Sequence, residues 1–171
     1  EISPDEVPSN FTTFYYTYLK KDEEVNKDIK FNKDILHQSK IINYFNGDYA
    51  KSKIEKDLNN FLKKIKKDKK YFISKKDIIL IESIKSDGIE VSKKYDDLYE
   101  IDESEIPTDI QVMINNNEIG STVLRLIEVI GEDKLEALDE DTLYFIISAL
   151  NQLDIDYIRN KILLKVLPLK V

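Results

Sequence analysis

The stretch that decides the fold is "INYFNGDYAKSKIEKDLNNFL", residues 42–62, in which Asn-Gly-Asp separates two segments with apolar residues at helical spacing. The second segment has the clearest pattern in the chain, and its apolar residues would share one narrow helical face within a field of lysines. These residues are Ile54, Leu58, Phe61, Leu62 and Ile65. We therefore predict a helix here and a corner at Asn-Gly, with Asp48 placed to cap the next helix.

A cation-binding loop is the alternative interpretation of this corner, because Asn and Asp offer oxygen ligands. An EF-hand loop, however, needs oxygen ligands at alternating positions and a Glu at its twelfth position. Counted from Asn46, the twelfth residue is Asp57, and Tyr and Lys residues interrupt the ligand pattern. The pattern favours a helix corner.

Similar corners recur along the chain. "INNNEIGSTVLRLIEVI" (residues 114–130) and "LNQLDIDYIRNKILLKVL" (residues 150–167) each place an Asn- or Gln-rich turn and an acidic residue before an apolar-periodic segment. A weaker corner lies at Asp87-Gly88. The corners are about 30 to 40 residues apart, which is the length of one helical hairpin in solenoid arrays.

"NGDYAKSKIEKDL", residues 46–58, resembles the turn and second helix of a tetratricopeptide-like repeat, in which a Gly-Asp-Tyr corner is common. Ala50 or Ser52 can serve as the small residue that the family pattern places early in the second helix. The Pro that closes a repeat in that pattern has no counterpart near residue 70. The resemblance implies an antiparallel helical hairpin and assigns no specific family.

The predicted fold class is all-α: stacked antiparallel helical hairpins, either solenoid-like or a compact helical bundle. Four Gly and four Pro are too few for a β-sandwich or barrel with frequent turns. We expect residues 1–8 to form an entry arm and residues 9–171 to form a single α-helical domain. Its hairpin corners are predicted near residues 46–49, 87–89, 116–120 and 152–155.

Other residues mark the expected helix starts. Ser74 is a predicted N-cap, and a short helix is expected around residues 92–99. A helix over residues 33–45 is predicted, with Asn32 as its N-cap. The remaining starts are predicted at Pro107-Thr108, at Ser121, at the acidic residues 139–141 and at Asp154.

Composition bounds the chemistry. With 42% hydrophobic and 35% charged residues, the sequence has a soluble, globular composition, and no apolar run reaches the ~20 residues of a membrane span. The chain has no Cys, so it has no disulfide, thiolate zinc site or Cys nucleophile. Glu1 in place of Met leaves open a removed signal peptide or a missing N-terminal domain, so a cytoplasmic and an exported location both stay open.

Charge is unevenly distributed. Residues 1–50, 51–76 and 77–171 carry net charges of −3, +8 and −12. A dominant acidic field disfavours nucleic-acid binding. The basic helix predicted over residues 51–70 could be a solvated packing helix, could bind a membrane surface, or could bind an acidic partner. Its lysines could also pair with the acidic stretch at residues 96–105 of the same chain. Lys63, Lys64, Lys66 and Lys67 are the candidate partner-binding residues on this helix.

Aromatic residues gather near the N-terminus in "FTTFYYTYL", residues 11–19. Phe11, Phe14, Tyr15 and Tyr18 follow the spacing of one helical face. They could pack within the fold or contact a protein partner, and they are the second set of candidate partner-binding residues.

Catalytic and metal-binding patterns are weak. His37 is the sole His, so a transition-metal site lacks its second ligand. The clusters Asp139-Glu140-Asp141 and Asp102, Glu103 and Glu105 could bind a cation, but acids before helices are usually caps. Neither a phosphate-binding loop nor a nucleophile elbow can be written from four isolated glycines. We expect no catalytic residue, no metal and no cofactor.

These observations predict a noncatalytic protein–protein interaction or scaffold module, the C-terminal part of a larger protein. Two alternatives stay open: a metal-dependent enzyme domain that uses paired carboxylates, and a membrane-peripheral adaptor that uses helix 51–70. Protein partners are expected, nucleic acid is not, and the oligomeric state is left open.

Overall fold

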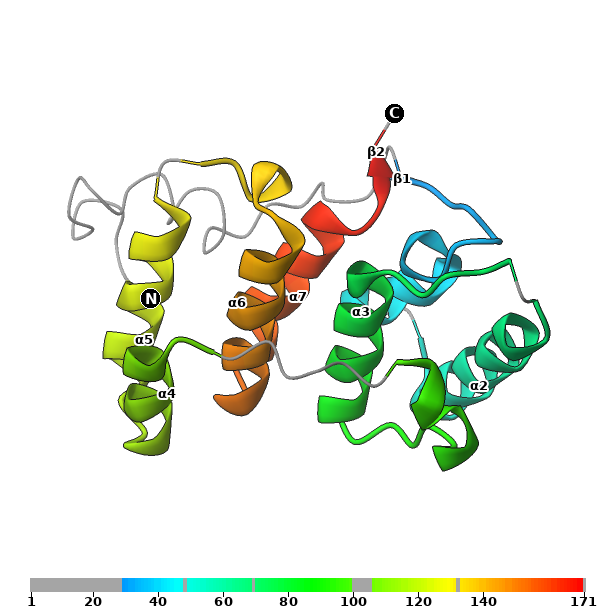
Figure 1. The fold of residues 1–171 in the computed structure, drawn as a ribbon, viewed down its shortest axis with the longest axis horizontal. Coiled ribbons are helices and arrows are strands. Elements are labelled where there is room, and N and C mark those ends of the chain that lie inside the picture. The colour runs from blue at the N-terminus through cyan, green and yellow to red at the C-terminus, as the bar shows by residue number, and fades with distance from the viewer. Residues whose placement is uncertain (1–28, 48, 69, 100–105, 132, 171) are drawn as a thin grey trace.

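The computed structural model describes residues 29–47, 49–68, 70–99, 106–131 and 133–170. This part of the chain is mostly helical, which confirms the all-α class (Figure 1). Its α-helices are α2 (Lys51–Lys67), α3 (Lys75–Ser86), α4 (Thr108–Asn115), α5 (Ile119–Ile130), α6 (Glu140–Gln152) and α7 (Asp156–Val166). The described part also contains four 3₁₀ helices: η4 (Leu36–Gln38) and η5 (Lys40–Asn46) before α2, η6 (Lys93–Leu98) between α3 and α4, and η7 (Leu135–Ala137) between α5 and α6.

Two short strands bring the ends of the described chain together. β1 (Ile29–Lys30) pairs antiparallel with β2 (Leu169–Lys170), so that Ile29 lies opposite Lys170. Nearby in the fold, η5 packs against α7. Elements from the start and the end of the described part are therefore neighbours.

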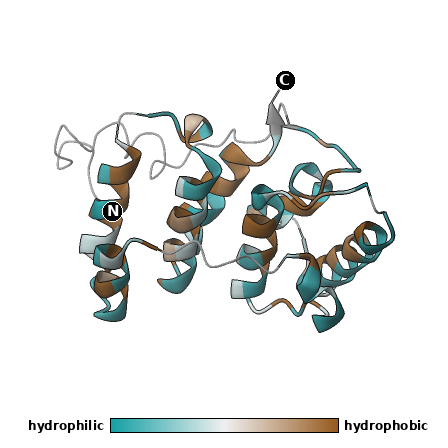
Figure 2. Cartoon of the chain, in the orientation of Figure 1, coloured by the Kyte–Doolittle hydropathy of each residue, from teal (hydrophilic) through white to brown (hydrophobic). Residues whose placement is uncertain are grey.

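The helices lie in a row in Figure 1, with α4 and α5 at one end, α6 and α7 in the middle, and α3 and α2 toward the other end. The broadest contact joins α3 and α6, which are far apart in the sequence. Two sequential pairs, α4–α5 and α6–α7, also pack together. Figure 2 shows hydrophobic and hydrophilic residues on different faces of the helices, as amphipathic packing requires.

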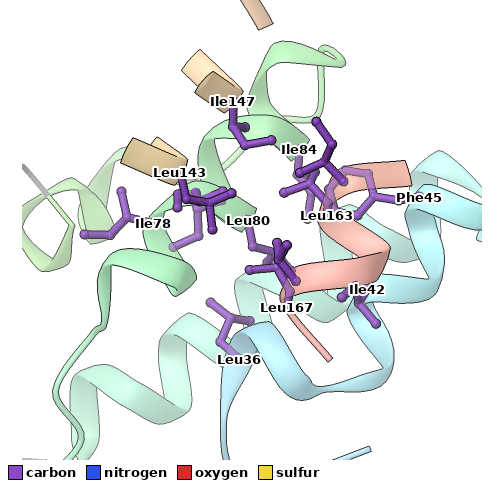
Figure 3. Close-up of a cluster of buried hydrophobic side chains, with 14 of the residues drawn as sticks. Leu36, Ile42, Phe45, Ile78, Leu80, Ile84, Leu143, Ile147, Leu163 and Leu167 are labelled. Carbon is purple, nitrogen blue, oxygen red and sulfur yellow. The ribbon is translucent and has the colours of Figure 1, made fainter. Parts of the chain in front are cut away.

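The core lies where η4, η5, α3, α6 and α7 meet. Leu36 and Ile42 come from the 3₁₀ helices, Leu80 comes from α3, and Leu143 and Leu163 come from α6 and α7; all of them are buried (Figure 3). The predicted seam of α2 joins this core through Ile54, Leu58, Leu62 and Ile65, while Phe61 is half-buried at its edge. The seam is therefore covered by the protein itself.

The continuous helix predicted over residues 33–45 is wrong, because two separate 3₁₀ helices, η4 and η5, form there. Residues 33–35 are non-helical, and Ser39 is extended between η4 and η5. The Ser39 hydroxyl accepts a hydrogen bond from the Ile41 amide, so its side chain caps a new 3₁₀ helix. Ser at this position competes with helix continuation, because its side chain satisfies backbone groups locally.

The corner at Gly47 also differs in its capping. Gly47 takes a left-handed conformation with φ of 81° and ends η5. Helix α2, however, begins at Lys51 with Ala50 at its N-cap and no side-chain cap, so Asp48 does not occupy the capping position. Asp48 itself lies outside the described residues.

Helix starts elsewhere follow the sequence more closely. Ser74 caps α3 in a capping box with Asp77, and Asp139 caps α6 by accepting from the amides of Asp141 and Thr142. Helix α5 begins at Ile119, two residues before the predicted Ser121. The short helix expected at residues 92–99 is the 3₁₀ helix η6.

Candidate functional site

A groove on the surface is the strongest candidate site in the described part of the chain. It has a volume of about 840 Å³ and lies between residues 30–41 and one face of α2, with Tyr49 just before that helix. One wall consists of residues 30–34 and 39–41, and the other consists of Tyr49, Asp57, Asn60, Phe61 and Lys64. This volume falls within the range of small-ligand and peptide pockets.

The wall at residues 30–41 is formed by the segment that follows β1. The Asn32 amide donates to the Gln38 carbonyl across 2.9 Å, which closes a compact loop before η5. Within that loop, the Asn32 side chain accepts a hydrogen bond from the Asp34 amide. The loop projects Lys33 and Asp34 into solvent, and Phe31 and Ile41, which lie on either side of the loop, line the groove.

The opposite wall is one face of α2 together with Tyr49. Phe61 packs edge-on against Tyr71, with ring centroids 6.4 Å apart, and this contact fixes the ring at the edge of the core. The Tyr49 hydroxyl donates to the Asp57 carboxylate across 3.3 Å. Burial and the nearby Asp57 raise the pKa of Tyr49, so this hydroxyl stays a donor at neutral pH.

One ion pair bridges the two walls. Lys64 Nζ lies 2.8 Å from the Asp34 carboxylate, and it also lies 5.9 Å from the centre of the Phe61 ring. The hydrogen bond and charge of Lys64 lower the pKa of Asp34. Both side chains are well exposed, so the ion pair links the two walls but adds little to the free energy of unfolding.

The four candidate lysines are divided by this arrangement. Lys64 lines the groove, whereas Lys63 and Lys67 are exposed on α2 outside it. Lys66 instead reaches η6, where its ammonium lies 3.0 Å from the Asp97 carboxylate and 2.6 Å from the Lys94 carbonyl oxygen. The contact with Asp97 joins this lysine to the acidic stretch at residues 96–105, as one of the interpretations of the basic helix predicted. The other candidate residues, Phe11, Phe14, Tyr15 and Tyr18, lie outside the described residues.

His37 belongs to a buried polar cluster. Its Nδ1 lies 2.7 Å from the Asp77 carboxylate, whose oxygens also accept from the His37 amide, the Tyr71 hydroxyl and the Ser74 amide. Burial raises the pKa of Asp77, but the hydrogen bonds from His37 and Ser74 outweigh it, so the pKa lies below its ordinary value. Asp77 is therefore held as a carboxylate that ties η4 to α3.

The geometry of this cluster is that of a structural network. The Ser74 hydroxyl lies 3.4 Å from Nδ1 of His37, the nitrogen that already contacts Asp77. A Ser-His-Asp triad requires the hydroxyl on the opposite nitrogen, Nε2, so that the proton can move from the serine. Nε2 instead faces the side-chain amide of Gln38 at 3.3 Å.

Two further observations bear on the alternatives. Within the described ranges, no three His, Cys, Asp or Glu side chains are grouped so that they could hold a metal ion. Asp139 is engaged in capping α6, while Asp102, Glu103 and Glu105 are outside the described residues. None of the described helices is long and apolar enough to cross a membrane.

Sequence reasoning missed most of the groove. The periodicity assigns Phe61 to the apolar seam, and it predicts a continuous helix, carrying Lys33 and Lys40, that does not form. Ser39 is the residue that could have indicated the groove. Ser favours N-cap positions, so a new helix can begin after Ser39, and residues 30–35 then stay non-helical and form a wall of the groove. Asp77 was also missed as the partner of His37, although Ser74 and Asp77 have the spacing of a capping box.

Comparisons with protein-family models, with curated proteins and with solved structures each find no significant match to this chain.

Proposed function

We propose that this chain is a noncatalytic protein-interaction module whose binding surface is the groove between residues 30–41 and α2. The observation that carries the proposal is the composition of this groove: an apolar surface of Phe31, Tyr49 and Phe61 is bordered by lysines and by asparagine amides. Concave apolar surfaces with a few oriented polar groups are the usual sites of ligand and peptide binding.

The proposal includes the arrangement of helices that presents the groove. Sequential packing of α4 with α5 and of α6 with α7 supports stacked hairpins. Contacts between α3 and α6, between η5 and α7, and between β1 and β2 join distant segments, whereas repeats of a solenoid contact only their neighbours. We therefore favour the compact helical bundle of the two arrangements, with the groove on its surface.

Site-specific photo-crosslinking in the native cell tests this function. A benzophenone amino acid replaces Asn60, an exposed residue of the groove, or Tyr157, a half-exposed residue of α7, as a matched control. The expected result is a covalent adduct with another protein from position 60, which is lost when Lys30 and Lys40 are also changed to Glu. Identical adducts from both positions, or no protein adduct from position 60, would contradict the proposal.

A further inference from the structure

The charges around the groove favour an anionic occupant. Lys30, Lys33 and Lys40 line one wall and Lys64 the other, against the two carboxylates of Asp34 and Asp57. Asp34 is engaged by Lys64, and Asp57 accepts the Tyr49 hydroxyl. Within the described part of the chain, neither Lys30 nor Lys40 has a carboxylate at ion-pair distance. The groove is thus locally positive on a chain of net charge −7.

The groove between these lysines also has an apolar surface, which favours an occupant that carries an apolar group as well as negative charge. Ile41 is buried, while Phe31, Tyr49 and Phe61 are half-buried and keep part of their surface accessible. A side chain that covers this surface gains the free energy of removing it from water, about 25 cal/mol per Å² before the costs of association. An occupant that offered only negative charge would leave this surface wet.

Lys53 occupies one of the aromatic faces on which a nucleotide base could stack. Its Nζ lies 4.5 Å from the centre of the Tyr49 ring. Proteins that bind single strands need open ring faces on which successive bases stack. Asp34 and Asp57 would also lie near a phosphate backbone. These features favour a polypeptide over a nucleic acid.

We infer that the groove binds a short segment of a partner protein that combines carboxylates with an aromatic or aliphatic anchor. The carboxylates contact Lys30 and Lys40, and the anchor covers Phe31 and Phe61. Asn60 makes no side-chain hydrogen bond within the described residues, so its amide is available to the backbone of that segment. The inference rests on the proposed function and specifies the chemistry of the partner.

Peptide selection on the full chain tests this inference. Random dodecapeptides displayed on phage are selected on the full chain, and the enriched peptides are then measured against two charge variants. One variant carries Lys30→Glu and Lys40→Glu in the groove. The other carries Lys56→Glu and Lys63→Glu, which are exposed on α2 outside the groove and give the same change in net charge. Circular dichroism and thermal unfolding check that both variants fold.

The expected peptides carry several Asp or Glu residues and at least one Phe, Tyr, Leu or Ile. Their affinity falls about tenfold or more for the groove variant and less than about twofold for the α2 variant. Their affinity also falls as the salt concentration rises, because their carboxylates contact the exposed lysines Lys30 and Lys40.

The other outcomes separate the two proposals. Peptides that need the groove lysines but lack net negative charge or an apolar anchor would overturn this inference and leave the proposed function standing. An oligothymidylate that binds the groove as tightly as the peptides would also overturn it. Failure to enrich any peptide that distinguishes the two variants would remove the groove as a binding surface, and with it the proposed function.

Discussion

At the scale of single residues, Asp77 shows how one buried carboxylate organises two elements. Its side chain is 1% exposed, and it accepts hydrogen bonds from the His37 amide and ring, the Tyr71 hydroxyl and the Ser74 amide. Tyr71 in turn accepts from the Leu36 amide. Burial raises the pKa of Tyr71, so its hydroxyl remains a donor to Asp77 at physiological pH. The cluster holds η4 in place between residues 30–34 and 39–41, the two segments that form one wall of the groove.

Replacing Asp77 with Asn tests the energetic importance of this cluster. The amide retains one acceptor oxygen and turns an NH₂ group toward donors, so several buried groups lose their partners. We expect the free energy of unfolding to fall by about 3 kcal/mol. Urea denaturation followed by circular dichroism measures it. Glu55 is exposed on α2, so Glu55→Gln is the control and should change the free energy of unfolding little. Equal stabilities of the two variants would show that the cluster contributes nothing.

The pH dependence of stability reports the same carboxylate. Because the folded-state pKa of Asp77 lies below the ordinary 3.8, its stabilisation is fully present above that value and is lost as pH falls through the folded pKa. The difference in unfolding free energy between the wild-type chain and Asp77→Asn should therefore shrink as the pH falls below about 4. Urea titrations at a series of pH values measure it. A difference that stays constant down to about pH 2 would contradict this assignment.

At the scale of elements, two glycines with no atom near their Cβ position differ only in backbone conformation, so their substitution compares left-handed strain with helix propensity. Gly47 ends η5 with φ of 81°, whereas Gly120 lies within α5, and a Cβ added at either would meet no atom within 4 Å. Gly47→Ala should therefore destabilise the protein by about 1 kcal/mol through left-handed strain. Gly120→Ala should stabilise it by about 0.5 kcal/mol, because Ala favours a helix. Thermal unfolding compares the pair, and shifts of the same sign would contradict the assignment.

The two arginines of the chain provide a second comparison between elements. Arg159 of α7 is 1% exposed, and its guanidinium contacts groups that end or follow α3 and α6. Its partners are Asp87, Asp156, Ser86, Asn151 and Asn160, and it also lies 5.8 Å from the centre of the Phe45 ring. Arg125 on the surface of α5 pairs with Asp109 and Glu128.

Changing Arg159 to Met should cost about 3 kcal/mol, because it removes a buried guanidinium and leaves the half-buried Asp87 carboxylate and the amides of Asn151 and Asn160 without their partner. Arg159→Lys should recover only part of this loss, since an ammonium cannot reproduce the planar set of five donors. Arg125→Met should leave stability almost unchanged, because its ion pairs are exposed. Equilibrium unfolding in urea measures all three variants. Similar losses at the two arginines would show that burial does not decide the contribution of these ion pairs.

The elements also show how far sequence reasoning reaches. The seam of α2 and the capping residues Ser74 and Asp139 were readable, because helix periodicity and N-caps are local in sequence. The helix predicted over residues 33–45 was wrong, because Ser39 and the buried contacts of His37 outweigh its apolar spacing. The groove depends on that interruption and on the pairing of walls about 30 residues apart, such as Asp34 with Lys64. Neither can be derived from spacing alone.

At the scale of the whole molecule, stability should be concentrated where distant segments meet. Helix α3 buries Ile78 through Ile81 together with Ser83 and Ile84, and it packs on α6 and η4. Helix α7 contacts η5, which contributes Lys40 and Ile41 to the wall of the groove. A rigid core under an exposed groove fits a binding surface that is formed before its partner arrives, which lowers the cost of ordering on association.

The pair α4–α5 should be the least stable part of this arrangement. Only Ile110 of α4 is buried, α5 buries Thr122, Leu126 and Ile130, and the pair reaches the rest of the molecule mainly through α6. Regions with few buried apolar contacts open at free energies below that of global unfolding. We therefore expect the amide hydrogens of α4 and α5 to exchange faster than those of α3 and α6 in native-state hydrogen exchange.

A cavity variant identifies the opening unit. Ile110 is fully buried, so Ile110→Ala should cost about 2–5 kcal/mol within the unit that contains it. If α4–α5 opens separately, Ile110→Ala should accelerate exchange in these two helices. Leu80→Ala in the core should accelerate exchange in α3 and α6 but leave that of α4 and α5 nearly unchanged, because the separate opening of α4–α5 keeps the contacts of Leu80 intact. Equal losses of protection in α3 and α5 caused by Leu80→Ala would mean that these helices unfold as one cooperative unit.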